Sequence, residues 1–312
     1  MCLALLLLIF SFNVSAQKTF KNPILPGFHP DPSICRVEND YYMVTSSFEW
    51  FPGLPIFHSK DLVNWEQIGH VLDRPSQLQM KDGLKASNGL WAPTIRYHQG
   101  TYYVICTATG CGGNFFVTAD SPEGPYSEPI FIKDAPGIDP SLFFDEDGTM
   151  WYCGSINGDN KIPPRRYPAE DRIYVQQLDP STGQFIGERH IVSSGYAINS
   201  PYAEAPHIYK IKGKYYLMIA EGGTWENHAV SVFTADNIVG PYTPFICNPV
   251  LTHRHLGNDI DITTIGHADL VQTQNGDWYS VMLGVRPVNG FNMLGRETFL
   301  TPVEFQGEQP IF

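Results

Sequence analysis

Short apolar runs that follow a polar turn recur five times along the chain. Each run carries two adjacent aromatic residues and continues into apolar positions, as in YYMVTSS from Tyr41, TYYVICTA from Thr101, TMWYCGS from Thr149, KYYLMIAEG from Lys214 and DWYSVMLG from Asp277. A turn followed by an aromatic, β-branched run is typical of the second strand of a hairpin. The second aromatic residues stand at 42, 103, 152, 216 and 279, and this near-regular spacing indicates an internal repeat.

A second related segment lies shortly before each aromatic pair. These five segments are PDPSICRV, WAPTIRYH, IDPSLFFD, EAPHIYKI and HADLVQTQ. Third apolar runs follow in several units, and no sustained helical period separates them. Five matching units of at least three strands predict an all-β fold, a five-bladed β-propeller. The propeller is expected to occupy residues 17–312 and to leave little room for another domain.

Residues 1–16 are predicted to be a secretory signal peptide. MCLALLLLIFSFNVSA is apolar and uncharged, too short to cross a bilayer, and ends in small residues that a signal peptidase accepts. It lacks the Lys or Arg that usually precedes the apolar run. The mature protein is therefore expected to be secreted or periplasmic. No later stretch is apolar enough for a membrane helix, so no membrane partner is expected.

Composition narrows the classes of partner. The net charge of −12 argues against nucleic acid, which requires a basic surface. After the signal peptide five cysteines remain, and an odd number does not describe a disulfide framework. The chain contains 16 Tyr, 6 Trp and 19 Phe, side chains that stack on sugars but also fill β cores. A neutral partner such as a carbohydrate stays open.

Acidic residues stand at the heads of the predicted innermost strands. In a propeller the first strand of each blade lines the central channel, so equivalent positions converge although they are far apart in sequence. The residues assigned to that position are Asp31, Ala92, Asp139, Glu204 and His267. Three carboxyl groups and one imidazole are expected to face one another. Because neighbouring carboxylates raise each other's pKa, such a cluster is more often functional than structural.

Carboxyl groups on opposite sides of a pocket suit glycoside hydrolysis. One donates a proton to the leaving oxygen and the other activates water, while a third tunes the pKa of the acid. Glu204, across the ring from Asp31, is the expected acid, and Asp139 suits the tuning role. The alternatives are a turn at the proline-bracketed Asp31, a solvated ring of acids, or a calcium site.

Several segments together resemble the glycoside hydrolases of family 43. They are PGFHPDPSICRVENDYYMVTSSFEWFPGLPIFHSKDLVNW, GIDPSLFFDEDG, AEAPHIYK, GHADLVQT and LGRETF, and the resemblance runs from about residue 22 to about residue 305. It is strongest to the β-xylosidase branch, whose members often have α-L-arabinofuranosidase activity too. The resemblance implies an inverting mechanism on terminal pentoses of xylan or arabinoxylan, with no required cofactor. It also implies that Asp31 is the general base, Glu204 the general acid and Asp139 the pKa modulator.

Other positions match the sugar pocket of that family one at a time. Phe48 in SSFEWFPG matches an aromatic wall, and Thr224 in EGGTWENH matches a position that lines the pocket. Trp91 and Ala92 in LWAPT match a stacking residue and its small neighbour. The alternative for Phe48 and Trp91 is a place in the hydrophobic core.

Two further positions carry polar roles in the family. His267 in GHADLVQT matches an axial histidine that in some relatives binds a central ion or its water. A central calcium ion at His267 therefore stays open, beside the alternative of a hydrogen-bonded structural histidine without metal. Arg296 in LGRETF matches an arginine that contacts substrate hydroxyls and the base, with a structural ion pair as its alternative.

The resemblance ends where relatives of this branch continue into a C-terminal β-sandwich. This chain stops at GEQPIF, so we expect either a truncated product or a one-domain form with a more open sugar pocket. The favoured function is a secreted O-glycosyl hydrolase that releases terminal xylose or arabinofuranose. The alternatives are an endo-arabinanase-like enzyme, which needs an open groove, and a non-catalytic carbohydrate-binding propeller.

Overall fold

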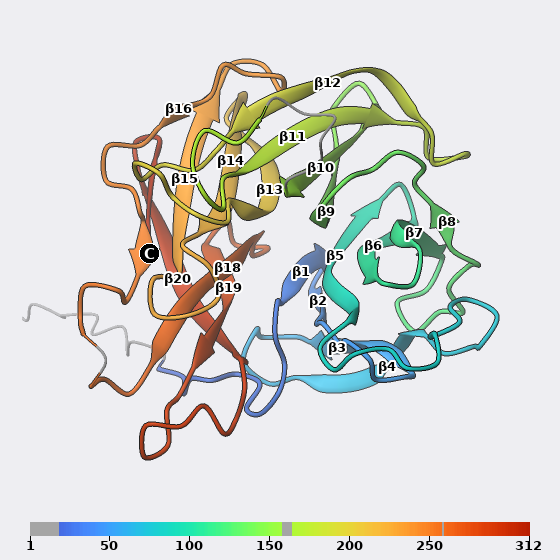
Figure 1. Cartoon of the computed structure of the whole chain (residues 1–312), viewed down its shortest axis with the longest axis horizontal. Coiled ribbons are helices and arrows are strands. Elements are labelled where there is room, and N and C mark those ends of the chain that lie inside the picture. Colours follow the sequence, from blue (N-terminus) through green and yellow to red (C-terminus); the bar gives the residue numbers. More distant parts are fainter. Residues whose placement is uncertain (1–18, 158–163, 258) are drawn as a thin grey trace, which may run out of the picture.

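The computed structural model describes residues 19–157, 164–257 and 259–312. Its strands form five antiparallel sheets arranged around a central axis, which confirms the predicted five-bladed β-propeller (Figure 1). Each sheet has four strands in chain order, apart from the fourth, which gains a fifth strand. The predicted signal peptide lies outside the described residues. The described part of the chain contains no helix that is long and apolar enough to cross a membrane.

The first four strands of every blade follow one another from the axis outward, and in blade 4 the fifth strand pairs with the third. Blade 1 contains β1 (Ser33–Val37), β2 (Asp40–Val44), β3 (Gly53–Ser59) and β4 (Glu66–Leu72). Blade 2 contains β5 (Gly89–His98), β6 (Thr101–Thr109), β7 (Gly113–Ala119) and β8 (Ile130–Phe131). Blade 3 contains β9 (Ile138–Phe144), β10 (Met150–Asn157), β11 (Asp171–Leu178) and β12 (Phe185–Ser193).

The last two blades complete the ring. Blade 4 contains β13 (Glu204–Ile211), β14 (Lys214–Glu221), β15 (Ala229–Ala235), β16 (Thr243–Pro244) and β17 (Leu251–Thr252). Blade 5 contains β18 (Thr263–Gln272), β19 (Trp278–Val285), β20 (Glu297–Gln306) and β21 (Gln309–Ile311). The five axial strands β1, β5, β9, β13 and β18 pack against one another in sequence, and β18 closes against β1.

The turns between the first two strands of a blade explain why these hairpins form. Gln99 and Gly100 join β5 to β6 with φ of 48° and 89°, and Lys212 and Gly213 join β13 to β14 with 51° and 82°. Positive φ at both central residues defines the hairpin turn whose twist matches that of the strands. The aromatic run then enters the second strand, as the repeat predicted.

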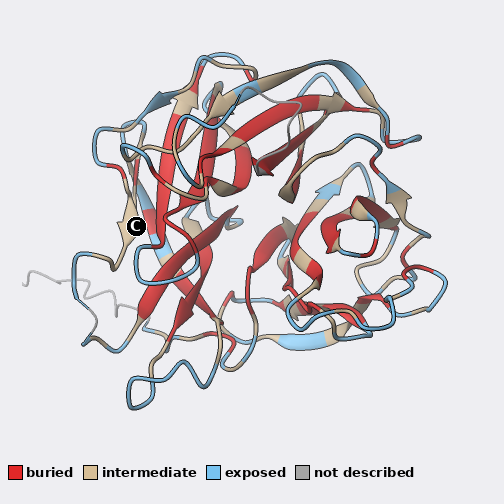
Figure 2. Ribbon diagram, in the orientation of Figure 1, coloured by how far each residue is buried: buried red, intermediate tan, exposed pale blue. Residues whose placement is uncertain are grey.

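The hydrophobic core is divided into five clusters, one between each pair of neighbouring blades. Figure 2 shows the buried residues concentrated on the inner strands, with exposed residues at the rim. Ring closure uses the N-terminal segment, where Ile24 and Leu25 donate backbone hydrogen bonds to the carbonyl oxygen of Thr298 in blade 5. Asn22 adds a side-chain bond to the carbonyl oxygen of Leu300. The blades are thereby held at fixed angles about the axis.

Candidate active site

One residue at the same point of each repeat has a left-handed backbone. The residues and their φ values are Asp31 (55°), Ala92 (44°), Asp139 (53°), Ala205 (49°) and His267 (49°). Proline follows the first four, and alanine follows the fifth. A non-glycine residue in this region costs about 1–3 kcal/mol and persists only where the surrounding structure enforces it. Such residues concentrate at functional sites, and here they encircle the axis.

The sequence-based alignment of blade 4 is wrong by one residue at this position. Comparison of the repeats aligns Glu204 with Asp31, but Ala205 has the left-handed backbone and precedes Pro206 as Asp31 precedes Pro32. The register of strand pairing shifts at this point in blades 2 to 5. A β-bulge of this kind re-aims side chains, so two consecutive residues of one strand face the axis. Glu204 reaches the axis as the first of such a pair.

All nine site residues predicted from the sequence line one cavity at the axis, of about 200 Å³. Blades 1 and 2 contribute Asp31, Phe48, Trp91 and Ala92, and blade 3 contributes Asp139. Blades 4 and 5 contribute Glu204, Thr224, His267 and Arg296. Ser87 and Ile138 complete the lining. Three carboxyl groups that lie 65 or more residues apart in sequence therefore meet in one pocket.

Asp31 is held by polar groups from three segments. Arg296 Nη1 donates to Asp31 Oδ1 at 2.5 Å, and Ser46 Oγ donates to Oδ2 at 2.6 Å. His267 Nδ1 lies 3.8 Å from Oδ1. Burial by itself disfavours the charge of this carboxyl, but Arg296, His267 and the Ser46 hydrogen bond outweigh it and hold the pKa of Asp31 below its ordinary value. Asp31 is therefore ionised at neutral pH.

Asp139 and Glu204 have the opposite tendency. Burial raises the pKa of Asp139 to about 6, with His267 opposing the shift and Asp31 adding to it. Burial also raises the pKa of Glu204 well above its ordinary value, and the carboxyls of Asp139 and Asp31 add to it. Asp139 Oδ2 accepts a hydrogen bond from the backbone N–H of Ala205 at 3.1 Å, which fixes the backbone next to Glu204. One carboxyl of the pocket thus favours the charged form and another favours the protonated form.

Aromatic side chains form one wall of the cavity. The Phe48 ring stacks on Phe28 with centroids 5.6 Å apart, and its edge meets Trp91 at 6.5 Å. The guanidinium of Arg296 lies over Phe48, 5.3 Å from the ring centroid. Trp91 is fixed by its indole N–H, which donates to the carbonyl oxygen of Ser87 at 2.7 Å. A flat aromatic wall beside charged hydrogen-bonding groups suits a sugar ring, which has apolar faces and polar edges.

The backbone that carries Phe48 requires a glycine beside it. Phe48 and Leu90 exchange two backbone hydrogen bonds of 3.0 and 2.9 Å between blades 1 and 2. Gly89, with φ of 98°, lies so close that an added Cβ would stand 2.2 Å from the carbonyl oxygen of Phe48. Only glycine allows this approach. The position of the aromatic wall therefore depends on Gly89.

The side chains around His267 do not by themselves form a calcium site. Calcium takes six to eight oxygen ligands from carboxylates, carbonyls and waters. In the residues that the structure describes, no group of three or more His, Cys, Asp or Glu side chains could hold a metal ion. The nearest carboxylate, Asp31, already accepts hydrogen bonds from Arg296 and Ser46. We therefore derive no chemical step through a central ion.

Sequence reasoning missed Ser46, which lies behind the pocket. Its Oγ donates to Asp31 and accepts the backbone N–H of Ala92 at 2.7 Å, so it links blades 1 and 2 at the base of the site. The signal available was the polar Thr45-Ser46-Ser47 run that ends an apolar strand. Ile138 was missed as well, although it precedes Asp139 as Glu204 precedes Ala205.

Comparison with known proteins assigns the family. The sequence profile of glycosyl hydrolases family 43 matches residues 20–310. The chain is 47% identical over 292 residues to a xylosidase/arabinosidase of Butyrivibrio fibrisolvens, covering 93% of this chain and 56% of that protein. It is 46% identical to the non-reducing end alpha-L-arabinofuranosidase BoGH43B of Bacteroides ovatus, covering 98% and 56%. The chain belongs to glycosyl hydrolases family 43.

Solved structures agree with this assignment. The crystal structure of a GH43_12 protein retrieved from a capybara gut metagenome matches with a TM-score of 0.87 and 43% sequence identity. The match covers 94% of this chain and 55% of that one. The chain thus spans a little over half the length of the curated relatives that it matches.

Proposed function

We propose that this chain is an inverting O-glycosyl hydrolase that releases terminal xylose or arabinofuranose from xylan and arabinoxylan oligosaccharides. The observation that carries the proposal is the pair of carboxyls whose environments push their pKa values apart within one cavity, Asp31 down and Glu204 up. Such divergence assigns acid and base roles at a given pH. Family membership and the names of the relatives support the reaction class.

Asp31 acts as the general base in this mechanism. Ionised beside Arg296, it accepts a proton from a water molecule that attacks the anomeric carbon. Glu204, kept protonated by burial and by its acidic neighbours, donates a proton to the leaving oxygen. Each bond change is balanced, since the proton taken from water at one side is matched by the proton given to the leaving group at the other. We expect the two carboxyl carbons to lie roughly 6.5–9.5 Å apart, as in inverting enzymes.

Asp139 serves Glu204 in two ways. Its charge, when present, raises the pKa of Glu204, and its hydrogen bond to the N–H of Ala205 holds the strand that carries the acid. Phe48 and Trp91 provide the apolar wall for the sugar ring, and Arg296 stands where it can bond to a sugar hydroxyl and to Asp31. Thr224 and Ala92 shape the rest of the lining.

The size of the cavity favours release of a single terminal sugar. About 200 Å³ is smaller than the usual volume of a ligand site, about 300–1,000 Å³, and suits one pentose better than a bound chain segment. An endo-arabinanase-like enzyme would need a groove across the propeller face. A purely sugar-binding propeller would have no use for three carboxyls gathered in one pocket, two of them, Asp31 and Asp139, at strained backbone positions. Both alternatives remain outcomes of the experiment below, and secretion or periplasmic export stays part of the proposal.

The test is hydrolysis of nitrophenyl pentosides and of xylan and arabinan oligosaccharides by the purified protein. We expect turnover of a β-xyloside, an α-arabinofuranoside or both, and release of monosaccharides. Preferential release of longer arabinan fragments would favour an endo-arabinanase-like enzyme. Binding of oligosaccharides without turnover of any substrate would favour the binding propeller and defeat the proposal.

Variants separate the roles of the two carboxyls. Asp31→Ala should abolish turnover of every substrate. Glu204→Ala should reduce cleavage of xylobiose by about 10²–10⁴-fold, yet spare dinitrophenyl pentosides, whose leaving group needs no proton. Glu188→Ala, an exposed carboxylate of β12, is the matched control and should retain full activity. Equal losses on both kinds of leaving group would contradict the acid role of Glu204.

A further inference from the structure

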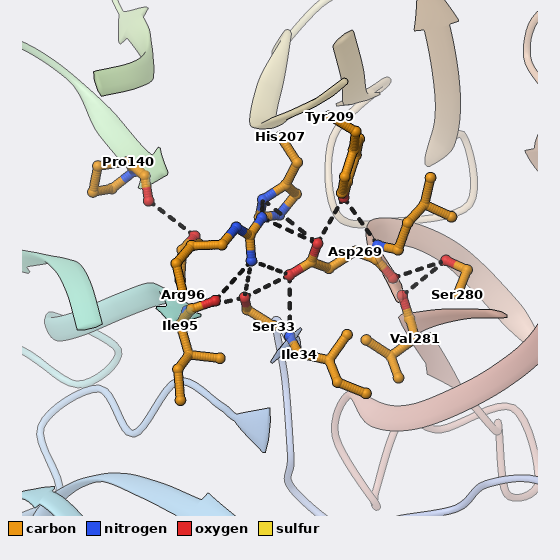
Figure 3. Close-up of polar contacts among 12 residues, drawn as sticks. Ser33, Ile34, Ile95, Arg96, Pro140, His207, Tyr209, Asp269, Ser280 and Val281 are labelled. Carbon is orange, nitrogen blue, oxygen red and sulfur yellow. Dashed lines mark hydrogen bonds and ion pairs between the residues drawn. The ribbon is translucent and has the colours of Figure 1, made fainter. Parts of the chain in front are cut away.

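A buried charged cluster lies on the axial strands two to five residues beyond the pocket. We call it the hub cluster and define it as Ser33, Arg96, His207, Tyr209 and Asp269, from blades 1, 2, 4, 4 and 5 (Figure 3). Asp269, Ser33 and His207 are at most 2% exposed. The mechanism proposed above uses none of these side chains.

Asp269 is the centre of the hub cluster. Its Oδ2 accepts hydrogen bonds from Ser33 Oγ at 2.6 Å, the backbone N–H of Ile34 at 3.0 Å and Arg96 Nη1 at 2.8 Å. Its Oδ1 accepts from Tyr209 OH at 2.6 Å and Arg96 Nη2 at 3.2 Å. Figure 3 shows these groups converging on the carboxylate from different strands. One side chain of blade 5 therefore accepts hydrogen bonds from blades 1, 2 and 4.

Arg96 extends the cluster to a histidine. Its Nη2 donates to His207 Nδ1 at 2.8 Å, and because arginine has no acceptor, His207 must carry its proton on Nε2 and be neutral. Burial lowers the pKa of His207 to about 3, although Asp269 opposes the shift. The cluster thus contains one cation and one anion, with a neutral imidazole and a neutral phenol.

Stability alone does not explain this arrangement. A buried ion pair contributes little compared with apolar side chains of the same volume, since both charges lose their hydration. The position of the cluster, close to the pocket residues on the same strands, indicates a role in the site. Ser33 follows Asp31 by two residues, Asp269 follows His267 by two, and His207 follows Glu204 by three. Thr94, in the same layer, donates through Oγ1 to the carbonyl oxygen of Pro140, next to Asp139.

We propose that the hub cluster positions the pocket carboxyls by fixing the axial strands that carry them. Because its cation and anion balance, it also places no net charge near those carboxyls. Two or three residues of extended chain place the cluster roughly 7–10 Å from the carboxyls. An unbalanced charge at that distance, in a protein interior, shifts the pKa of a carboxyl by about one unit. Balance within the cluster therefore matters for the protonation of the acid. The inference rests on the proposed function, because its readout is catalysis.

The test uses opposite changes of charge. Asp269→Asn leaves Arg96 unbalanced, and a nearby cation favours ionised Glu204, so the alkaline limb of the kcat/KM profile should move to lower pH by about 0.5–1 unit. Arg96→Met leaves Asp269 unbalanced, so the same limb should move to higher pH. The double variant should return the limb towards its original position. Other titratable or charged groups act on the same residues and stay unchanged in these variants. Cys35 lies near Arg96 and Asp269, and the groups near Glu204 are Asp31, Asp139, Asp171 and Arg296.

A similar ion pair at the far ends of two axial strands, six residues from Asp139 and from Glu204, serves as the control. Lys210 donates to Asp145 at 2.9 Å, and Tyr215 OH donates to the same carboxylate, so an aspartate is again held by a cation and a tyrosine between two blades. Asp145→Asn and Lys210→Met should lower the melting temperature without moving the pH limb. If the Asp269 and Arg96 variants behave in the same way, the cluster is only structural and the inference is overturned.

A milder substitution covers the case in which the charge variants fail to fold. Tyr209→Phe changes no charge but removes two hydrogen bonds, the one that Tyr209 OH donates to Asp269 and the one that it accepts from the backbone N–H of Leu270. A positioning role predicts a several-fold lower kcat at nearly unchanged KM, whereas a structural role leaves kcat of the folded protein unchanged. Wild-type protein that hydrolyses no pentoside would defeat the proposed function itself. Active wild-type protein with unaltered variants would defeat only this inference.

Discussion

The backbone N–H of Ala205 donates a hydrogen bond to Oδ2 of Asp139, 3.1 Å away. This bond joins blade 3 to blade 4 at the residue that follows Glu204, so the carboxyl that shifts the pKa of the acid also fixes the strand that carries it. Asn at position 139 keeps an oxygen acceptor for this bond but removes the charge. The two contributions of Asp139 can therefore be separated.

Asp139→Asn should move the alkaline limb of the kcat/KM profile to lower pH. The carboxyl of Asp139 helps raise the pKa of Glu204, so its loss lowers that pKa, and Glu204 loses its proton at lower pH. Asp139→Ala removes the acceptor as well and should cost more kcat at the same limb position. An unmoved alkaline limb in Asp139→Asn would contradict the electrostatic role.

Arg296→Met should move the acidic limb of the same profile to higher pH. The guanidinium holds the pKa of Asp31 below its ordinary value, and the base works only when deprotonated. Without the cation the pKa of Asp31 rises, and activity is lost earlier on acidification. Arg296→Lys retains a charge and should shift the limb less. KM should rise in both variants if Arg296 also contacts substrate.

Glu204→Gln should stabilise the protein at alkaline pH while reducing cleavage of natural glycosides by about 10²–10⁴-fold. The folded-state pKa of Glu204 is raised, so this residue contributes stability below its unfolded-state pKa of about 4.3, and that contribution is lost as pH rises towards the folded-state value. Gln has no such loss. Calorimetry should show a higher melting temperature than wild type at pH 8, by about 1–2 °C for each kcal/mol recovered, and no gain at pH 4. A lower melting temperature at pH 8 would contradict this.

Ser46→Ala should affect both stability and the acidic limb. It leaves the buried N–H of Ala92 without its acceptor, which costs about 1–3 kcal/mol in the free energy of unfolding, and it removes a hydrogen bond that lowers the pKa of Asp31. Ser47→Ala is the matched control, because Ser47 Oγ accepts the N–H of Leu54 and does not contact Asp31. Only the Ser46 variant should shift the acidic limb to higher pH.

The ring and the axial residues of the pocket could be predicted because both depend on repetition, whereas Phe48, Trp91, Thr224 and Arg296 were predicted only from the resemblance to family 43. A turn and an aromatic pair define each hairpin, and a related segment before each pair defines the axial strand, so side chains such as Asp31 and His267 converge in any five-bladed arrangement. Outer strands such as β8 and β16 have two residues each, too few to leave a sequence pattern.

The sequence alignment of blade 4 is wrong by one residue because it follows the acidic side chains and not the backbone conformation. Proline follows Asp31, Ala92, Asp139 and Ala205 alike, and this proline was the better marker of the left-handed position. The hub cluster could not be predicted for another reason. Arg96 and Asp269 lie 173 residues apart, and their bond depends on the way in which axial strands from different blades face each other. No local pattern encodes that contact.

The anomeric configuration of the first sugar released tests the proposed acid and base most directly. Proton NMR during hydrolysis of a β-xyloside, or of an α-arabinofuranoside, detects the configuration before mutarotation. Base-assisted attack of water opposite a protonated Glu204 predicts inversion, so α-xylose or β-arabinofuranose should appear first. Initial release of the sugar with retained configuration, or no release from either substrate, would contradict it.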